Sequence, residues 1–315
     1  MTDDNYIQSA LTQYGIPNVK YELLRHNENM TVKVGEQYLL RIHKHAEGFT
    51  SVPIYEGFDR DKIRRTELSL LGHMNECGMR VQSPIPNKAG ELLTVLADGT
   101  CATMLEWISG HTLEKDDVTY DLCFRIGAMV AQMHQAVQNF YPDEILDYDA
   151  ALCGRIGGKL AQEAESGSLK EKYASVLRAA CCVMGNRLEK NQKILVVHAD
   201  LSKSNILITD AGLVPIDFSL FGRGNPMMDI GVLYGSFGSL DHRRAIAEGY
   251  RSNGGEIDFP MLDVCFALNV MLYIILHIKT CEEKNLDRWC NEIFGPLNDG
   301  KQLIQEDFFM PNISH

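Results

Sequence analysis

The sequence predicts an α+β protein with two lobes, in which a small antiparallel β-sheet with one helix precedes a larger, mainly helical part. Short apolar runs separated by turn residues fill positions 21 to 108, a pattern typical of hairpins. Beyond Gly110 the apolar residues recur at helical spacing instead. We therefore divide the chain into an N-terminal lobe (1–104), a hinge (105–110) and a helical C-terminal lobe (111–315).

Two hairpins are expected in the N-terminal lobe. Residues 30–34 and 37–42 flank a Gly35-Glu36 turn, and residues 92–96 and 101–107 flank an Asp98-Gly99 turn. The larger, helical lobe contains one expected island of strand, in which residues 194–197 precede a hairpin formed by 205–209 and 213–218. The longest apolar stretch, residues 259–278, contains polar residues and a proline, which favours a buried helix over a membrane span.

One helix, near residues 62–76, interrupts the hairpins, and Glu67 falls within its apolar stripe. A carboxylate on such a stripe is costly unless a cation partners it. Arg41, on the strand at 37–42, is the best candidate for that partner. The alternative interpretation is an exposed ion pair on the surface of the lobe.

Composition limits the class of protein. The chain has 42 acidic and 30 basic residues, and its formal charge of −12 repels nucleic acid and anionic lipid. Nine cysteines are an odd number without a Cys-x-x-Cys pair, which favours reduced thiols over disulfides or zinc. The N-terminus lacks the pattern of a signal peptide. We expect a cytoplasmic protein with neither a nucleic-acid nor a membrane partner; the sequence does not indicate an oligomeric state.

A spaced set of polar residues lies in the second lobe. A single aspartate after a strand is usually a turn or capping residue. Here an aspartate at a strand end, an amide five positions later and a second aspartate across a hairpin place oxygen-bearing side chains around one point. Such ligands suit Mg²⁺, which commonly takes one or two carboxylates plus substrate phosphates. In chain order the set is His198, Asp200, Asn205, Asp217 and Asp229.

This spacing resembles that of the aminoglycoside phosphotransferase and choline kinase family, distant relatives of protein kinases. The matching pattern is His-Gly-Asp, four residues, Asn, then Ile-Asp-Phe, and finally Pro followed closely by Asp; the likeness extends from about residue 21 to 250. It implies a bilobal, protein-kinase-like fold. It also implies transfer of the γ-phosphoryl group of ATP or GTP, with Mg²⁺, to a hydroxyl of a small-molecule alcohol such as an amino sugar or amino alcohol.

The kinase template assigns roles to these residues. We expect Asp200 to be the catalytic base, because a loop aspartate accepts the hydroxyl proton in that template. Asn205 and Asp217 are the expected Mg²⁺ ligands. The resemblance implies that His198 and Asp229 brace the catalytic loop, and a buried aspartate does need such hydrogen-bond donors.

The resemblance also places the nucleotide in the N-terminal lobe. It implies that a strand cation bridges the triphosphate and Glu67; the usual residue is lysine, but Arg41 can grip phosphate bidentately, with Lys33 and Lys44 as alternatives. In place of a glycine-rich loop, the turn at 26–29 would put Asn29 near the phosphates. The main chain of Glu106 and Ile108, in the hinge, would meet the purine, which leaves the choice between ATP and GTP open.

Three positions depart from the family pattern, and two other functions stay open. Ala199 and Ser219 stand where the family has glycine, and Ser202 stands where histidine is common. A protein serine/threonine kinase of the same fold is one alternative, although only eleven residues separate Asp217 from Asp229, too few for an activation segment. The other is a nucleotide-binding pseudokinase or regulatory module. Acidic residues of the second lobe, among them Glu283 and Asp287, would either attract a cationic substrate or form solvated helix faces.

Overall fold

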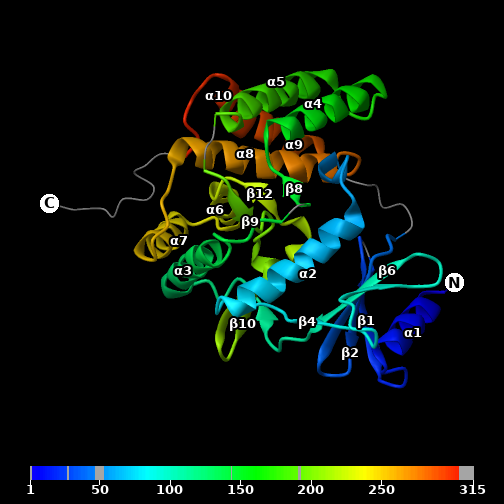
Figure 1. Cartoon of the computed structure of the whole chain (residues 1–315). Coiled ribbons are helices and arrows are strands. Elements are labelled where there is room, and N and C mark those ends of the chain that lie inside the picture. Colours follow the sequence, from blue (N-terminus) through cyan, green and yellow to red (C-terminus); the bar gives the residue numbers. More distant parts are fainter. Residues whose placement is uncertain (1, 27, 47–52, 143, 191–192, 305–315) are drawn as a thin grey trace.

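The structure is a computed structural model that describes residues 2–26, 28–46, 53–142, 144–190 and 193–304. It confirms the predicted α+β class, with a β-sheet at one end of the molecule and helices at the other (Figure 1). The sheet is antiparallel, with strand order β1-β2-β3-β6-β4 and β5 paired to β6. Its strands are β1 (Tyr21–His26), β2 (Met30–Val34), β3 (Tyr38–Ile42), β4 (Pro84–Ile85), β5 (Leu93–Val95) and β6 (Cys101–Glu106).

The two faces of this sheet have different coverings. Side chains alternate between the faces of a strand, and one face packs its apolar residues, Met30 and Val32 among them, against helix α1 (Asp3–Tyr14). The sequence did not predict α1. The opposite face carries Thr31 and Arg41 and looks toward helix α2 (Arg60–Glu76), which lies between the sheet and the helical lobe (Figure 1). Because α2 begins after its capping residue Asp59, it starts two residues before the predicted helix.

The C-terminal part is built from pairs of packed helices, α3 with α7, α4 with α5 and α6 with α8. Their apolar sides form one continuous core. The described helices are α3 (Tyr120–Ala136), α4 (Ala150–Glu165), α5 (Glu171–Leu188), α6 (Met227–Ser236), α7 (Leu240–Ser252), α8 (Phe259–Leu276), α9 (Glu283–Trp289) and α10 (Gly295–Asn298).

Two small sheets carry the loops of this part. The predicted hairpin is present as β10 (Ile206–Thr209) and β11 (Gly212–Pro215), and β7 (His111–Thr112), just after the expected hinge, joins it in the order β11-β10-β7. The second sheet, β8-β12-β9, was predicted only at its β9 strand. Its members are β8 (Leu146–Asp147), β9 (Leu195–Val197) and β12 (Gly222–Gly224).

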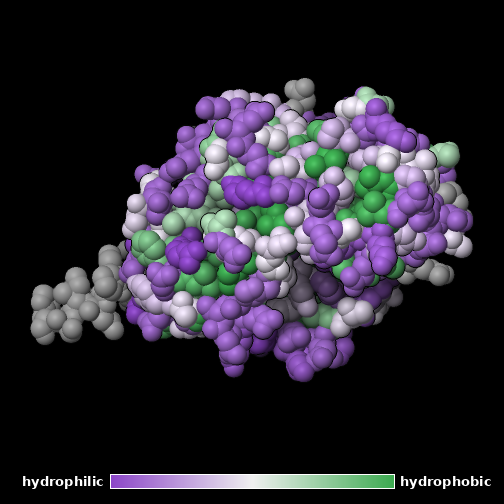
Figure 2. Space-filling view, turned by 90° about the horizontal axis from the view of Figure 1, so that it is seen from below, coloured by the Kyte–Doolittle hydropathy of each residue, from purple (hydrophilic) through white to green (hydrophobic). Residues whose placement is uncertain are grey.

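The apolar helix α8 is long and hydrophobic enough to cross a membrane by length and composition, but 56% of it is buried inside the protein. Its buried residues belong to the main core, as the sequence predicted for this stretch. Seen from below, the molecular surface is mainly hydrophilic, with hydrophobic residues gathered in separate patches (Figure 2).

Candidate functional site: a catalytic loop facing an arginine pair

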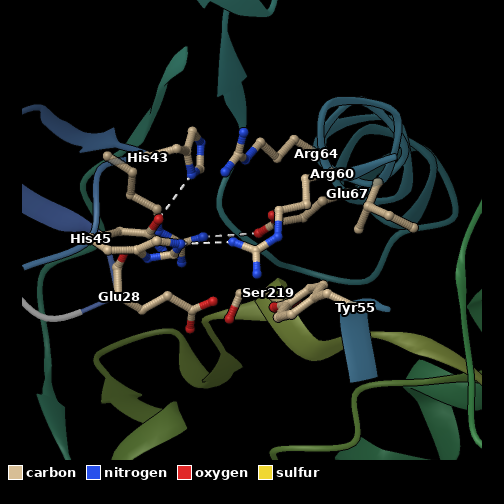
Figure 3. A pocket seen from close by; sticks show the side chains of 11 residues that line it. Glu28, His43, His45, Tyr55, Arg60, Arg64, Glu67 and Ser219 are labelled. Carbon is tan, nitrogen blue, oxygen red and sulfur yellow. Dashed lines mark hydrogen bonds and ion pairs between the residues drawn. The ribbon is translucent and has the colours of Figure 1, made fainter. Parts of the chain in front are cut away.

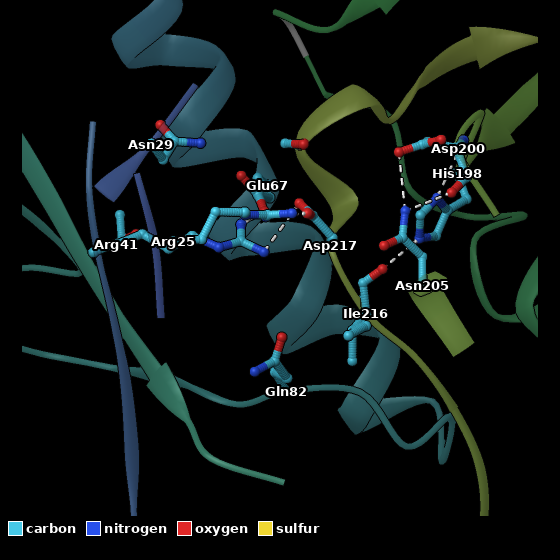
Figure 4. Close-up of polar contacts among 12 residues, drawn as sticks. Arg25, Asn29, Arg41, Glu67, Gln82, His198, Asp200, Asn205, Ile216 and Asp217 are labelled. Atoms are coloured by element: carbon cyan, nitrogen blue, oxygen red, sulfur yellow. Dashed lines mark hydrogen bonds and ion pairs between the residues drawn. The ribbon is translucent and has the colours of Figure 1, made fainter. Parts of the chain in front are cut away.

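The loop between β9 and β10 brings Asp200 and Asn205 into direct contact. The Asn205 amide nitrogen Nδ2 donates to the Asp200 carboxylate oxygen Oδ2 at 2.9 Å and to the Asp200 main-chain carbonyl at 2.7 Å (Figure 4). This arrangement leaves the amide oxygen of Asn205 directed away from the aspartate. The Asn205 carbonyl accepts from the main-chain N–H of Ile216 at 2.9 Å, which ties the loop to the segment that carries Asp217.

Buried groups hold the loop from behind. Asp229, fully buried at the start of α6, accepts from the main-chain N–H groups of His198 at 3.1 Å and Ala199 at 2.7 Å. The His198 ring lies between the Ile216 carbonyl, 2.9 Å from Nε2, and the Asp200 main-chain nitrogen, 3.3 Å from Nδ1. These contacts fix the backbone on both sides of Asp200.

The loop also contains a strained residue. Ala199 adopts a positive φ of 63°, in the left-handed region that favours glycine, which explains why the family pattern has glycine there. Asp217 shares this conformation, with φ 62°. Non-glycine residues of this kind often cluster at functional sites.

The N-terminal lobe contributes Arg41, which contacts Asp217 from the side of the β-sheet. The predicted ion pair is present, with Arg41 Nη1 2.9 Å from Glu67 Oε1, and its side chains are only 7% and 9% exposed, which rules out a solvated surface pair. The other guanidinium nitrogen, Nη2, lies 3.1 Å from Asp217 Oδ1. A second arginine, Arg25 from β1, lies 3.3 Å from Asp217 Oδ2 (Figure 4).

The pKa values of Asp200 and Asp217 are shifted in opposite directions. Burial raises the pKa of Asp200, and the nearby Asp217 carboxylate raises it further against the opposing effect of His198. Burial also acts to raise the pKa of Asp217, but the Arg41 and Arg25 guanidiniums outweigh it and hold that pKa below its usual value. The pKa of Asp200 is therefore raised and that of Asp217 is lowered, although both carboxylates are in the same site.

A polar cavity of about 30 Å³ lies next to this arginine, between the β1–β2 turn, the end of β3 and α2 (Figure 3). Asn29 lines it, and its Oδ1 is 3.0 Å from His43 Nδ1. His45 Nδ1 lies 2.8 Å from the Glu28 carbonyl, and His45 Nε2 accepts from Arg60 at 2.7 Å. Asn27 lies outside the described residues.

In the expected hinge, the Glu106 carbonyl already has one hydrogen-bond partner within the protein. The Glu106 carbonyl, expected to face a purine, accepts from the buried Gln82 side chain at 3.0 Å, and the Glu106 carboxylate pairs with Arg80 at 2.6 Å. Ile108 lies in the segment between β6 and β7 and is partly buried. This leaves one lone pair of the Glu106 carbonyl for another donor.

The two alternative lysines are engaged elsewhere. Lys33 Nζ pairs with Glu36 at 2.6 Å and lies over the Trp107 ring. Lys44 Nζ lies 3.4 Å from Asp3, on the side of α1. Of the three candidate cations, Arg41 is therefore the one that meets both Glu67 and Asp217.

Sequence reasoning missed three residues that the structure brings to the site. They are Arg25, Gln82 and His134, whose Nε2 lies 2.9 Å from Asp229 Oδ2. His134 sits on the buried face of α3, where a sequence pattern does not distinguish it from any core histidine. A polar residue on an apolar stripe, the signal that identified Glu67, indicates that His134 is buried but not that it contacts Asp229.

Comparison with known proteins agrees with this geometry. A model of the phosphotransferase enzyme family matches residues 21–262. A homoserine kinase of Neisseria meningitidis serogroup B is 33% identical over 178 residues, which are 52% of this chain and 52% of that protein. A homoserine kinase of Cupriavidus taiwanensis is 33% identical over 122 residues, covering 39% of this chain and 30% of that protein. The matches thus span about half, or less, of these relatives.

Solved structures share the fold at low sequence identity. An amicoumacin kinase in complex with AMP-PNP and Ca²⁺ aligns with a TM-score of 0.74 at 16% identity, covering 98% of this chain and 96% of that one. A microcompartment-associated aminopropanol kinase aligns with a TM-score of 0.71 at 21% identity, covering 94% and 95%. Since the family model matches most of the chain, this protein belongs to the phosphotransferase enzyme family of the aminoglycoside phosphotransferase type.

Proposed function

We propose that the protein transfers the γ-phosphoryl group of ATP or GTP to a hydroxyl group of a small molecule. The observation that carries this proposal is the Asp200 carboxylate, whose pKa is raised mainly by burial and which is fixed by Asn205 opposite the Arg41–Asp217 pair. A raised pKa makes a carboxylate a better proton acceptor near neutral pH.

The reaction assigns one task to each group. Asp200 accepts the proton of the acceptor hydroxyl while the hydroxyl oxygen forms a bond to the γ-phosphorus. The bond between that phosphorus and the bridging oxygen breaks, and the nucleoside diphosphate leaves. Arg41 contributes positive charge beside the phosphates, because it remains charged between Asp217 and Glu67.

The donor set suits a hard divalent cation. The Asn205 amide oxygen and the Asp217 carboxylate would hold Mg²⁺, which prefers oxygen ligands and completes its shell with substrate phosphates. Bound there, the ion neutralises charge that develops on the transferred group. His198 and Asp229 would act as supports of the loop. Residues 1–104 would then form the nucleotide-binding lobe, 105–110 a hinge whose Glu106 and Ile108 meet the purine, and 111–315 the acceptor lobe.

Two structural relatives support a nucleotide donor: the amicoumacin kinase was solved with AMP-PNP, and an aminoglycoside 2'-phosphotransferase-IIIa, which shares the fold, was solved with GDP. Asn29 would lie near the phosphates, at the turn above Arg41.

For the acceptor we propose a small amino alcohol. Two kinds of relative are kinases of homoserine and of aminopropanol, which both carry an amine and a hydroxyl. In this proposal, the acidic residues of α9 do not bind the amine of the acceptor. Glu283 and Asp287 pair with Lys170 and Lys172 at 2.7 and 3.3 Å, as a solvated helix face would.

A phosphorylation screen tests the function. Purified protein is incubated with ATP or GTP, Mg²⁺ and a set of amino alcohols, amino sugars and nucleosides, and nucleoside diphosphate release is measured. We expect release that depends on one class of alcohol and disappears in Asp200→Asn. Phosphorylation of an added protein substrate instead would favour a protein kinase. Nucleotide binding without release under any condition would favour a regulatory module.

A further inference from the structure

Arg25 reaches the proposed phosphate site from a strand that the sequence did not connect with it. It lies near the end of β1, and its Nη2 is 3.3 Å from Asp217 Oδ2. Its side chain is 57% exposed, whereas that of Arg41 is only 7% exposed. Arg25 is thus an exposed cation that spans from the N-terminal sheet to the carboxylate expected to bind Mg²⁺.

A β-bulge aims this arginine at the site. Leu23 is opposite Val32, but Arg25 is opposite Thr31, so that Leu24 is an extra residue in β1. Thr31 is in turn opposite Arg41 on β3. Bulges commonly re-aim a side chain beside a functional site.

The bulge puts Arg25, Thr31 and Arg41 in one cross-strand row on the same sheet face. Neighbouring strands are about 4.8 Å apart, so Arg25 on β1 and Arg41 on β3 are about 10 Å apart at the backbone, with β2 between them, and their long side chains approach one carboxylate from two sides. Without the extra residue, Leu24 would stand opposite Thr31, and the row would hold a single arginine.

The next residue anchors the end of the strand. His26 points to the other face, where its ring nitrogens lie 3.2 Å from Asp3 Oδ2 and 3.2 Å from the Lys44 carbonyl. These contacts hold the backbone next to Arg25, whereas the Arg25 side chain is mostly exposed and has Asp217 as its carboxylate partner. Arg41, by contrast, has a second carboxylate partner in Glu67 that keeps it where it is.

We propose that Arg25 is a second polyphosphate-binding residue and that it competes with Mg²⁺ for the Asp217 carboxylate. This inference rests on the proposed function. A metal ion and a guanidinium repel each other when both bind the Asp217 carboxylate. Arg25 is the exposed partner of that carboxylate, so Mg²⁺ displaces Arg25. Once displaced, its charge remains beside the phosphates, where a fork of N–H donors binds their oxygens well.

The test compares ligands with and without phosphates. Equilibrium titrations measure the affinity of the wild type, Arg25→Ala and Arg25→Lys for adenosine and for a non-hydrolysable ATP analogue over a range of Mg²⁺ concentrations. We expect Arg25→Ala to weaken analogue binding at least about tenfold, since hydrogen bonds to charged groups are among the stronger ones. Adenosine affinity should not change, and Arg25→Lys should recover part of the loss as a point charge.

The competition has its own readout. Less free Mg²⁺ should be needed for half-maximal analogue binding in Arg25→Ala, because the metal no longer displaces a guanidinium. The control is Arg65→Ala, which removes an arginine of similar exposure, 52%, that pairs with Glu91 at 3.6 Å on the outer side of α2. This control should bind both ligands as the wild type does.

Three outcomes would overturn the proposal. Equal analogue affinity in Arg25→Ala and wild type would show that Arg25 does not contact phosphate. An equal loss for adenosine and analogue would indicate a disturbed sheet rather than a lost phosphate contact. If Arg25→Ala needed as much or more free Mg²⁺ for half-maximal analogue binding than the wild type, Arg25 would not compete with the metal. If the wild type itself binds neither ligand, the proposed function fails as well, so the two failures are distinguishable.

Discussion

The half of the site in the N-terminal lobe is held by ion pairs between side chains, whereas the half in the C-terminal lobe is held by hydrogen bonds to the main chain. Arg41 is buried between Glu67 and Asp217, at 2.9 and 3.1 Å. Asp229 is equally buried, but it accepts from two backbone N–H groups of the catalytic loop and from the His134 ring.

This difference determines how each half of the site responds to a charged ligand. An arginine can exchange one carboxylate for a phosphate without moving its backbone, so the N-terminal half is adjustable. Backbone donors bound to Asp229 have no such alternative, so the C-terminal half keeps Asp200 in one place. Positioning of the reacting groups before the reaction contributes strongly to catalysis.

The largest effect is expected at Asp200. Asp200→Asn should lower kcat roughly 10²- to 10⁴-fold, the range for general-base catalysis, while nucleotide affinity stays close to that of the wild type. The melting temperature should not fall. Because the pKa of Asp200 is raised in the folded state, mainly by burial, its ionised form destabilises the fold at neutral pH, and a neutral amide avoids this cost. Steady-state kinetics and thermal unfolding check both points; wild-type turnover in the variant would refute the role.

The main-chain anchoring can be broken at Asp229. Asp229→Ala leaves the N–H groups of His198 and Ala199 buried without their acceptor, which should cost on the order of 3 kcal/mol of unfolding free energy. Turnover of the remaining folded protein should fall as well, because the loop is no longer fixed. Urea unfolding and kinetics below the transition measure the two effects.

Asp263→Ala is the matched control for this experiment. Asp263 is also a buried carboxylate that accepts from two main-chain N–H groups, those of Leu303 at 2.9 Å and Ile304 at 2.8 Å, but it lies outside the site. It should lose comparable stability and keep the turnover of the folded fraction. If both variants lost turnover equally, the effect at Asp229 would be one of general destabilisation.

The ion pairs of the other half can be broken at Arg41. Arg41→Ala leaves the Glu67 carboxylate buried without its cation, which should lower the unfolding free energy by about 3 kcal/mol. Nucleotide affinity should fall as well. Replacing both residues, as in Arg41→Met with Glu67→Leu, should recover stability but not affinity, because packing can substitute for an ion pair and not for phosphate recognition. Unfolding and nucleotide titrations separate these effects. Recovery of both by the double variant would contradict the phosphate role of Arg41.

The pH dependence of turnover should sharpen the contrast between the two aspartates. Asp200 must be ionised to accept a proton, and its pKa is raised, so kcat should fall on acidification at a pH above the ordinary aspartate pKa. Asp217 has a lowered pKa, because Arg41 and Arg25 outweigh its burial, and its stabilising contribution is lost only at lower pH. Activity should therefore decline before stability does. A pH profile of kcat beside one of the melting temperature tests the order.

The smallest effect is expected at Ala199, whose left-handed conformation costs roughly 1–2 kcal/mol in an L-residue. Ala199→Gly should relieve this strain. The glycine also gives the unfolded chain more conformational freedom, which lowers the stability by about 0.4–1 kcal/mol. The net gain in stability should therefore lie between about 0 and 1.6 kcal/mol. Ala211→Gly, in the β10–β11 turn where φ is not positive, should give no gain. Chemical denaturation of both variants decides; equal effects would show that the strain is not stored at Ala199.

The sequence contained the signals for the parts of the site that depend on local order. The spacing of Asp200, Asn205 and Asp217 predicted a shared location, because a loop and a hairpin of fixed length bring these positions together. Glu67 on an apolar stripe predicted a buried partner, since an unpaired carboxylate is too costly there.

Tertiary structure alone decided the remainder. The bulge that aims Arg25 at Asp217 depends on how β1 and β2 align, and a one-residue change of register is not visible in the composition of a strand. His134 meets Asp229 only because α3 packs against the catalytic loop, and Gln82 meets the Glu106 carbonyl only because β4 pairs with β6. The sequence by itself determined which residues must pair or cluster locally, whereas the packing of distant elements determined which additional side chains complete the site, because such contacts leave no regular spacing along the chain.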